Sequence, residues 1–72
     1  MPLSMINPGQ KARIMRVTGL DATKKHLGSL GFTVGTVVAV VCSTGDNLII
    51  AIHDSRIAIN GDIANHVFVE AL

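Results

Sequence analysis

The side chains of this chain that could ligate a transition metal are its three histidines and its single cysteine. These residues are His26, Cys42, His53 and His66. Zinc sites in proteins draw their ligands from closely spaced pairs, such as Cys-x-x-Cys or two histidines a few residues apart. The four residues are instead widely separated, and no cluster of carboxylates accompanies them. We therefore predict no local metal site and no bound cofactor.

Nucleophilic catalysis would need a nucleophile, a base and an orienting group that meet in one pocket. The one cluster that offers these types is Ser43, His53 and Asp54. His53 and Asp54 are neighbours at the end of a predicted strand, so their side chains point to opposite faces. The glycines of residues 28–35 also lack the Lys-Ser/Thr ending of a phosphate-binding loop. We therefore predict no catalytic residues and no enzymatic activity.

Basic side chains gather in the first third of the chain, while most of the acidic residues come later. A basic patch raises RNA binding by a small barrel as an alternative. Proteins that bind single strands combine a strongly basic groove with aromatic stacking. The net charge here is only +1 and aromatic residues make up 3% of the chain. Nucleic acid is therefore not the expected partner, and solvated faces or the polar rim of a protein contact explain the charges better.

The length and composition indicate one small domain, residues 1–72, with more apolar side chains than its core can hold. The chain has 72 residues, of which 49% are hydrophobic and 15% are charged. A domain of this length buries only about 60% of the surface of its extended chain. We therefore expect an exposed apolar patch, which usually marks contact with a partner or another subunit.

Several features favour a cytoplasmic protein. The longest apolar runs, Val37–Cys42 and Leu48–Ile52, are much shorter than the roughly 20 residues that cross a bilayer. The N-terminus lacks the basic and long apolar regions of a signal peptide. A single cysteine excludes an intramolecular disulfide, which suits a reducing compartment. We expect no insertion into a membrane.

The hydrophobic pattern predicts five short strands and one helix. The expected strands are Lys11–Val17, Val37–Ser43, Leu48–His53, Arg56–Asn60 and His66–Glu70, with a tight turn at residues 61–65. In the first strand the alternation reverses after Ile14, which predicts a bulge near Arg16. Strands this short, in a chain this small, indicate a small, strongly bent antiparallel barrel.

The helix is expected from Ala22 to Ser29 or Leu30, with Asp21 as its N-cap. We expect Leu27 and Leu30 on its inner side, assisted by Leu20. Lys24, Lys25 and His26 are consecutive, so they should spread over the outer surface. Gly31 follows where a helix C-terminus often needs a positive φ.

The two central strands form a predicted hairpin whose faces are both apolar. Centring its turn on Gly45-Asp46 places Cys42 opposite Ile49. The further pairs are Ser43 with Leu48, Val41 with Ile50, Val40 with Ala51, Ala39 with Ile52 and Val38 with His53. One face then carries Val38, Val40, Cys42, Ile49, Ala51 and His53, and the other carries Val37, Ala39, Val41, Leu48, Ile50 and Ile52. In this register Cys42 and His53 share a face but lie four residues apart along the strands, about 14 Å, so we expect at most a weak metal site or one shared between subunits.

Only one face of this hairpin can line the core of a small barrel. The other must be covered by the helix, the N-terminal segment, another subunit or a partner. We predict that Val38, Val40, Ile49 and Ala51 lie on the outer face. A slip of one residue would exchange them for Val37, Ala39, Ile50 and Ile52.

The order of short motifs along the chain resembles the FeoA family. The motifs are Met5-x-x-Pro8-Gly9, Ala12-x-Ile14, Leu27-x-x-Leu30-Gly31-x-x-x-Gly35, Arg56-Ile57-Ala58-Ile59 and Ala64-x-x-Val67-x-Val69. None is specific alone, but the ordered set covers nearly the whole chain. Val34 stands where the family usually has proline, and Asn60 where it often has a basic residue.

The resemblance implies an SH3-like β-barrel with one short helix between its first two strands. It also implies a cytoplasmic accessory protein that binds and regulates FeoB, the membrane transporter for ferrous iron, so that a connection with iron would come through this partner. The same domain occurs at the C-terminus of DtxR-like repressors, so a stand-alone module that regulates a metal-dependent repressor is the alternative. No helix-turn-helix precedes the domain here, which favours the transport protein.

We expect two contact surfaces on this module. Lys24, Lys25 and the exposed sides of Leu27 and Leu30 would form the first. The outer hairpin face, with Val38, Val40, Ile49 and Ala51, would form the second or the seam of a homo-oligomer. Whether such contacts activate or restrain a transporter is left open.

Overall fold

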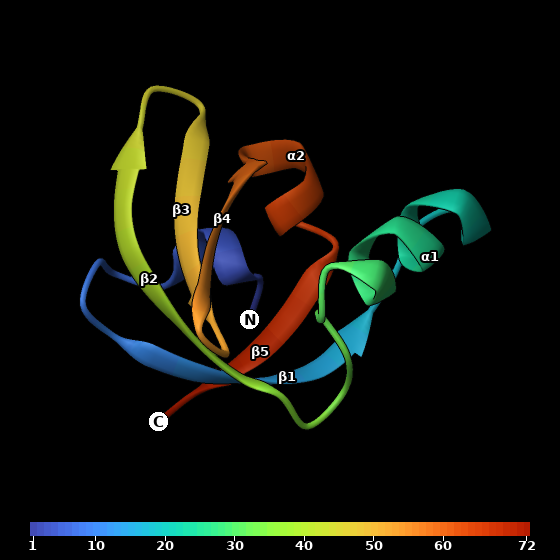
Figure 1. Cartoon of the computed structure of the whole chain (residues 1–72), viewed down its shortest axis with the longest axis horizontal. Coiled ribbons are helices and arrows are strands. Elements are labelled where there is room, and N and C mark those ends of the chain that lie inside the picture. Colours follow the sequence, from blue (N-terminus) through green and yellow to red (C-terminus); the bar gives the residue numbers. More distant parts are fainter.

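The computed structural model describes all 72 residues and contains one antiparallel sheet of five strands in the order β4-β3-β2-β1-β5 (Figure 1). The strands are β1 (Lys11–Val17), β2 (Val37–Thr44), β3 (Asn47–Ile52), β4 (Ser55–Asn60) and β5 (Val67–Ala71). The helices are the 3₁₀ turn η1 (Leu3–Met5), α1 (Asp21–Ser29) and the single turn α2 (Gly61–Ala64). The predicted five-stranded antiparallel fold, with one short helix between its first two strands, is confirmed.

The sheet bends sharply, so that its two ends face each other across one core. In Figure 1, β2, β3 and β4 stand upright while β1 and β5 run across the lower part of the molecule. β2 joins the two halves, because it pairs with β1 through Val37–Ala39 and with β3 along nearly all of its length. β4 and β5 are the two ends of the sheet and do not pair with each other.

The N-terminal segment packs along one side of the barrel, where it pairs with β5. Met1 forms two backbone hydrogen bonds with Val69 of β5, of 3.0 and 2.7 Å. The turn η1 then directs Leu3 and Ile6 into the core, where both are buried. Part of the excess apolar surface is therefore covered from within the chain.

The core consists only of hydrophobic side chains, and no polar or charged residue is buried. Its members are Leu3, Ile6, Ala12, Ile14, Leu27, Phe32, Val38, Val40, Ile50, Ile52, Ile59, Ala64, Val67 and Val69. Phe32 is the largest of the fully buried side chains. Burial of apolar surface is the dominant favourable term in folding, so these residues hold the barrel together.

Two bulges interrupt the ladders. In β1 the register with β5 shifts between Ile14 and Arg16, as the reversed alternation predicted. In β2 the register with β3 shifts between Val40 and Cys42, which leaves Val41 as an extra residue. The pairs next to the turn are as predicted, including Cys42 with Ile49.

The bulge at Val41 makes the predicted outer face wrong for Val38 and Val40. Beyond the bulge, Val40 pairs with Ile50 and Val38 with Ile52, so the alternation is reversed. Val38 and Val40 are therefore in the core, 2% and 1% exposed. Ile49 and Ala51 do lie on the outer face, where they are partly exposed. The alternative register, shifted by one residue, is also wrong for Ile50 and Ile52, because both are buried.

Helix α1 starts one residue earlier than predicted. Asp21 is its first residue, and the N-cap is Leu20, in an extended conformation without a capping side chain. The prediction that Asp21 caps the helix is therefore wrong. Leu20 is 78% exposed, so its assignment to the inner side of the helix is wrong as well.

Gly31 ends the helix in the left-handed conformation that the sequence indicated, with φ +99°. The N–H of Gly31 donates to the carbonyl of Gly28, and the N–H of Phe32 donates to that of Leu27, both at 3.0 Å. This pair of bonds is a Schellman motif. It directs Phe32 into the core immediately after the helix.

Adding one methyl group at Gly31 or at Gly28 should have opposite effects on stability. Gly31→Ala is expected to lower the free energy of unfolding by about 1–3 kcal/mol, because of its positive φ. Its new Cβ would also lie 3.2 Å from Ile52 Cδ1. Gly28 lies within α1 with nothing near its Cβ position, so Gly28→Ala should raise the free energy by up to about 1 kcal/mol. Urea denaturation measures both, and a change of the same sign would contradict the assigned helix end.

Candidate protein-interaction surface

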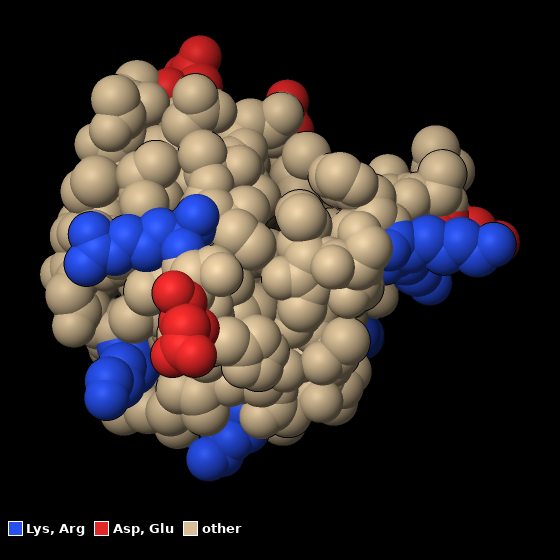
Figure 2. All heavy atoms as spheres, in the orientation of Figure 1, with Lys and Arg blue, Asp and Glu red and all other residues tan.

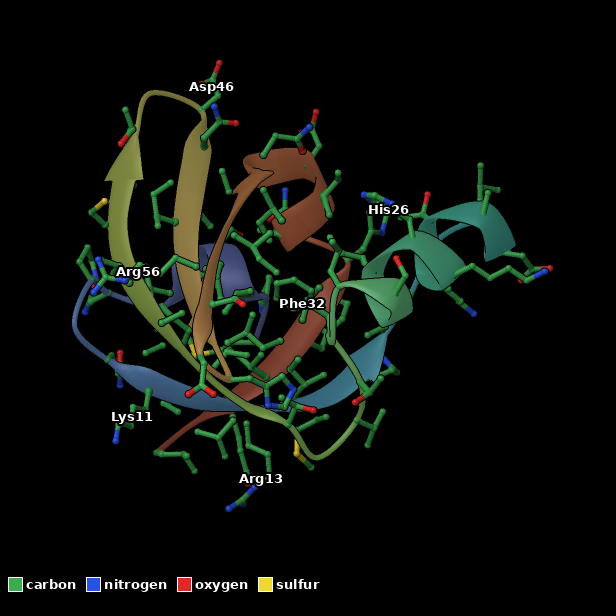
Figure 3. All side chains as sticks on the ribbon, in the orientation of Figure 1. Lys11, Arg13, His26, Phe32, Asp46 and Arg56 are labelled. Atoms are coloured by element: carbon green, nitrogen blue, oxygen red, sulfur yellow. The ribbon has the colours of Figure 1, made fainter.

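Helix α1 stands away from the barrel and is the most exposed element of the fold (Figure 1). Leu27 is its only buried residue and anchors it to the core. Lys24, Lys25 and His26 follow one another on its exposed surface. Figure 2 shows basic side chains beside an acidic one at the tip of this projection, and Figure 3 shows His26 on the same helix. Helix α1, called the arm below, therefore presents positive charge to solvent, away from the barrel.

The structure separates the four residues predicted for the first contact. Lys24 and Lys25 are exposed, and Leu30 is partly exposed where the helix ends. Leu27 is 0% exposed, so its predicted place on the contact surface is wrong. The spacing of Leu27 and Leu30 correctly indicated the apolar side of the helix. The Leu27 side chain is buried completely in the core, however, so none of it is left for a contact.

Leu20 is the apolar surface residue of this region that the sequence analysis missed. It lies seven residues before Leu27, a spacing that puts two residues on one side of a continuous helix. The helix begins only at Asp21, however, and the extended backbone of Leu20 turns it out of that series. Leu20 accepts the first helical hydrogen bond, from the N–H of Lys24 at 3.0 Å. An exposed leucine therefore stands at the start of the basic arm.

Both ends of the arm are attached through a glycine packed against a histidine ring. A Cβ added at Gly19 would lie 3.4 Å from His66 Nδ1, and one added at Gly31 would lie 3.4 Å from the ring of His53. Both glycines have positive φ. The Thr18 hydroxyl also lies 3.3 Å from His66 Nδ1. Two of the three histidines thus pack at the base of α1, a role that the sequence did not reveal.

No group of three or more His, Cys, Asp or Glu side chains is arranged to hold a metal ion. Cys42 is exposed on the outer face of β2. His53 lies in the turn between β3 and β4 with φ 52°, so the predicted pairing of Val38 with His53 is wrong.

The one pocket of the molecule is an open polar depression of about 700 Å³ at the tip of the β2–β3 hairpin. It is lined by Ser4, Ser43, Gly45, Asp46, Asn47, Leu48, Asn60, Gly61 and Asp62. Sites for small molecules are mostly apolar with a few polar groups. This depression has the reverse composition, since Leu48 is its only hydrophobic residue. The depression therefore lacks the composition that is typical of a small-molecule site.

Five antiparallel strands bent around one core, with an arm inserted between the first two, place the molecule among the SH3-like barrels. The sequence profile of the FeoA domain matches residues 1–71, and the chain belongs to the FeoA family. This family is associated with ferrous iron transport. No curated protein matches the chain. None of its helices has the length and apolar character needed to cross a membrane.

Solved structures agree with this assignment. A crystal structure of an iron uptake regulatory protein (FeoA) is 32% identical, with a TM-score of 0.93, over 100% of this chain and 97% of that one. The FeoA of Stenotrophomonas maltophilia, solved with zinc and described as an SH3 domain protein, is 29% identical with a TM-score of 0.88, over 97% and 89% of the two chains.

The same fold occurs as part of larger proteins. A manganese-dependent transcriptional repressor matches 100% of this chain with 36% of its own length, at 16% identity and a TM-score of 0.91. At this identity the likeness concerns the fold alone. It agrees with the relation between FeoA proteins and the C-terminal domain of such repressors.

Proposed function

We propose that this protein is a cytoplasmic, non-catalytic accessory protein of ferrous iron transport that binds and regulates a FeoB-type membrane transporter. The observation that carries this proposal is the exposed α1 arm of a FeoA-family barrel. Lys24 and Lys25 lie on the arm, and the exposed Leu20 lies at its base. The contact joins apolar area from Leu20 and Leu30 to positive charge, and an acidic surface of the transporter would complement it.

The attachment of the arm supports this role. A single buried leucine anchors α1, and the hydrogen bonds around Gly31 fix its direction. A surface that is already ordered loses less conformational entropy when it binds a partner. The arm can therefore engage another protein without any rearrangement of the barrel.

A second candidate function is a stand-alone module that regulates a metal-dependent repressor. The likeness to the C-terminal part of the manganese-dependent repressor favours it. Such a module would dock on a soluble regulator and not on a membrane protein. The proteins that the tagged chain retains distinguish the two functions.

A pull-down tests the proposal. Tagged protein is incubated with detergent-solubilised native membranes and with the soluble fraction, and the retained proteins are identified by mass spectrometry. We expect a FeoB-type transporter from the membranes. Lys24→Glu/Lys25→Glu should reduce its recovery at least tenfold, because both side chains are exposed and attract acidic groups.

The control is Asp46→Asn/Asp62→Asn, which removes two exposed charges, one at the tip of the β2–β3 hairpin and one in α2. Its recovery of the transporter should equal that of the unaltered chain. Recovery of a soluble repressor alone would support the second candidate instead. If Lys24→Glu/Lys25→Glu recovered as much transporter as the unaltered chain, α1 would not be part of the contact.

A further inference from the structure

The outer face of the sheet carries a row of four residues that runs across four strands. Lys11 of β1 pairs with Ala39 of β2, Ala39 pairs with Ala51 of β3, and Ala51 pairs with Arg56 of β4. Paired residues point to the same face of a sheet. Their sequence neighbours Ala12, Val38, Val40, Ile50 and Ile52 are buried, so the row faces outward. Two small apolar side chains thus lie between two cations.

The rows on either side extend the apolar area. One contains Val37, which pairs with Arg13 and is 43% exposed. The other contains Ile49, which pairs with Cys42 and with Ala58. Ile49 is partly exposed and Ala58 is exposed. Ala39 and Ala51, which we call the alanine row, therefore lie at the centre of a wider apolar face.

The charges on this face do not balance. Arg13 forms the one ion pair of the structure, with Glu70 at 2.7 Å. Lys11 and Arg56 have no acidic partner, and both are exposed. Figure 2 shows basic side chains along this side of the molecule, with an acidic group beside them, and the labels of Figure 3 place Lys11, Arg13 and Arg56 there. The face has an excess of positive charge.

In Figure 3 the Arg56 side chain extends from β4 over the sheet in the direction of β2. The small side chains of Ala51 and Ala39 leave room for this course. Long basic side chains cover apolar surface with their stems while their charged ends stay in water. Arg56 has no ion-pair partner, so its exposed side chain can turn aside from the alanines to pair with an acidic group on the flank of a docked helix.

We propose that this outer face binds an amphipathic α-helix of a partner protein, with its apolar side on the alanine row and acidic residues paired with Lys11 and Arg56. Three strand spacings separate the Cα atoms of Lys11 and Arg56 by about 14 Å along the sheet. A helix with its side chains is about 10 Å wide, so it fits between them. This surface does not involve α1 and does not depend on the transporter contact proposed above.

The charges favour this occupant over a second copy of the chain. A two-fold dimer through this face would place Lys11 and Arg56 of one copy against the same two residues of the other copy. Like charges brought together at an interface cost several kcal/mol. A lipid surface is disfavoured because the centre of the face offers alanines and not projecting large apolar side chains.

The test uses ¹⁵N-labelled protein and a synthetic peptide of about 18 residues, or five helical turns. The peptide has leucines and alanines on one side and glutamates along both flanks. We expect saturable amide shifts centred on Ala39 and Ala51. A matched peptide with lysines in place of the glutamates should cause none, because it would repel the face.

Two charge-reversal variants of equal size complete the experiment. Lys11→Glu/Arg56→Glu should weaken binding of the acidic peptide at least tenfold, while Lys24→Glu/Lys25→Glu should leave it unchanged. Absence of saturable binding, equal binding of the lysine peptide, or shifts confined to α1 would each overturn the proposal. So would shifts on this face with phosphatidylglycerol vesicles in place of the peptide, or a dimer that buries it.

Discussion

Val40→Lys is expected to unfold the domain. Val40 is 1% exposed and packs in the centre of the core. A lysine there would be charged without a partner, and an unpaired buried charge costs several kcal/mol. A domain of this size has a total stability of only about 4–11 kcal/mol. The variant should lose the dispersed amide spectrum and the cooperative thermal transition of the unaltered chain.

Val37→Lys is the matched control, since it places the same residue on the same strand. Val37 is 43% exposed on the outer face, so the ammonium group can stay in water. The free energy of unfolding should change by less than about 0.5–1 kcal/mol. A folded Val40→Lys together with an unfolded Val37→Lys would mean that the bulge at Val41 is wrongly placed.

Phe32→Ala is expected to cause the second large effect, a loss of about 3–5 kcal/mol in the free energy of unfolding. Phe32 is 2% exposed and is the largest side chain of the core. Its removal would leave a cavity where the end of α1 meets the barrel. Urea denaturation followed by circular dichroism measures the loss.

The only other phenylalanine of the chain provides the comparison. Phe68 of β5 is partly exposed, and its ring centre lies 4.7 Å from the Arg16 guanidinium carbon. Phe68→Ala would remove less buried area and one cation–π contact worth about 0.5–1 kcal/mol. Its loss of stability should be less than half that of Phe32→Ala. Equal losses would contradict the assigned core.

The two bulges show how much of the sheet could be predicted from the sequence. In β1 the alternation of Lys11, Ala12, Arg13 and Ile14 marks the faces, so its reversal exposes the bulge. In β2 the residues from Val37 to Val41 are all apolar and mark neither face. The number of strands and the hairpin turn were therefore predictable, but the exposed face of the hairpin was not.

Of the candidate site on α1, only the exposed basic residues could be predicted from the sequence. Three consecutive basic residues on a short helix must lie largely outside, and Lys24 and Lys25 do. The positions of Leu20 and Leu27 depend on the residue at which α1 starts and on packing against the core. The N-terminal segment could be expected only as one of several possible covers of apolar surface, because a 3₁₀ turn of three residues has no periodicity to detect.

The packing of His53 and His66 against glycines depends on contacts between distant segments. No local pattern could indicate these contacts. The chemistry that the histidines first suggested was metal binding, whereas their visible contacts are with the base of α1.

Site-specific photocross-linking in living cells tests the central claim, that the α1 arm contacts a FeoB-type transporter. A photoreactive phenylalanine would replace Lys25 on the arm in one variant and Asp46 at the tip of the β2–β3 hairpin in the other. Both side chains are exposed, so neither replacement should disturb the fold. We predict a cross-link to the transporter from position 25 and none from position 46. A cross-link from position 46 alone, or from neither position, would contradict the claim.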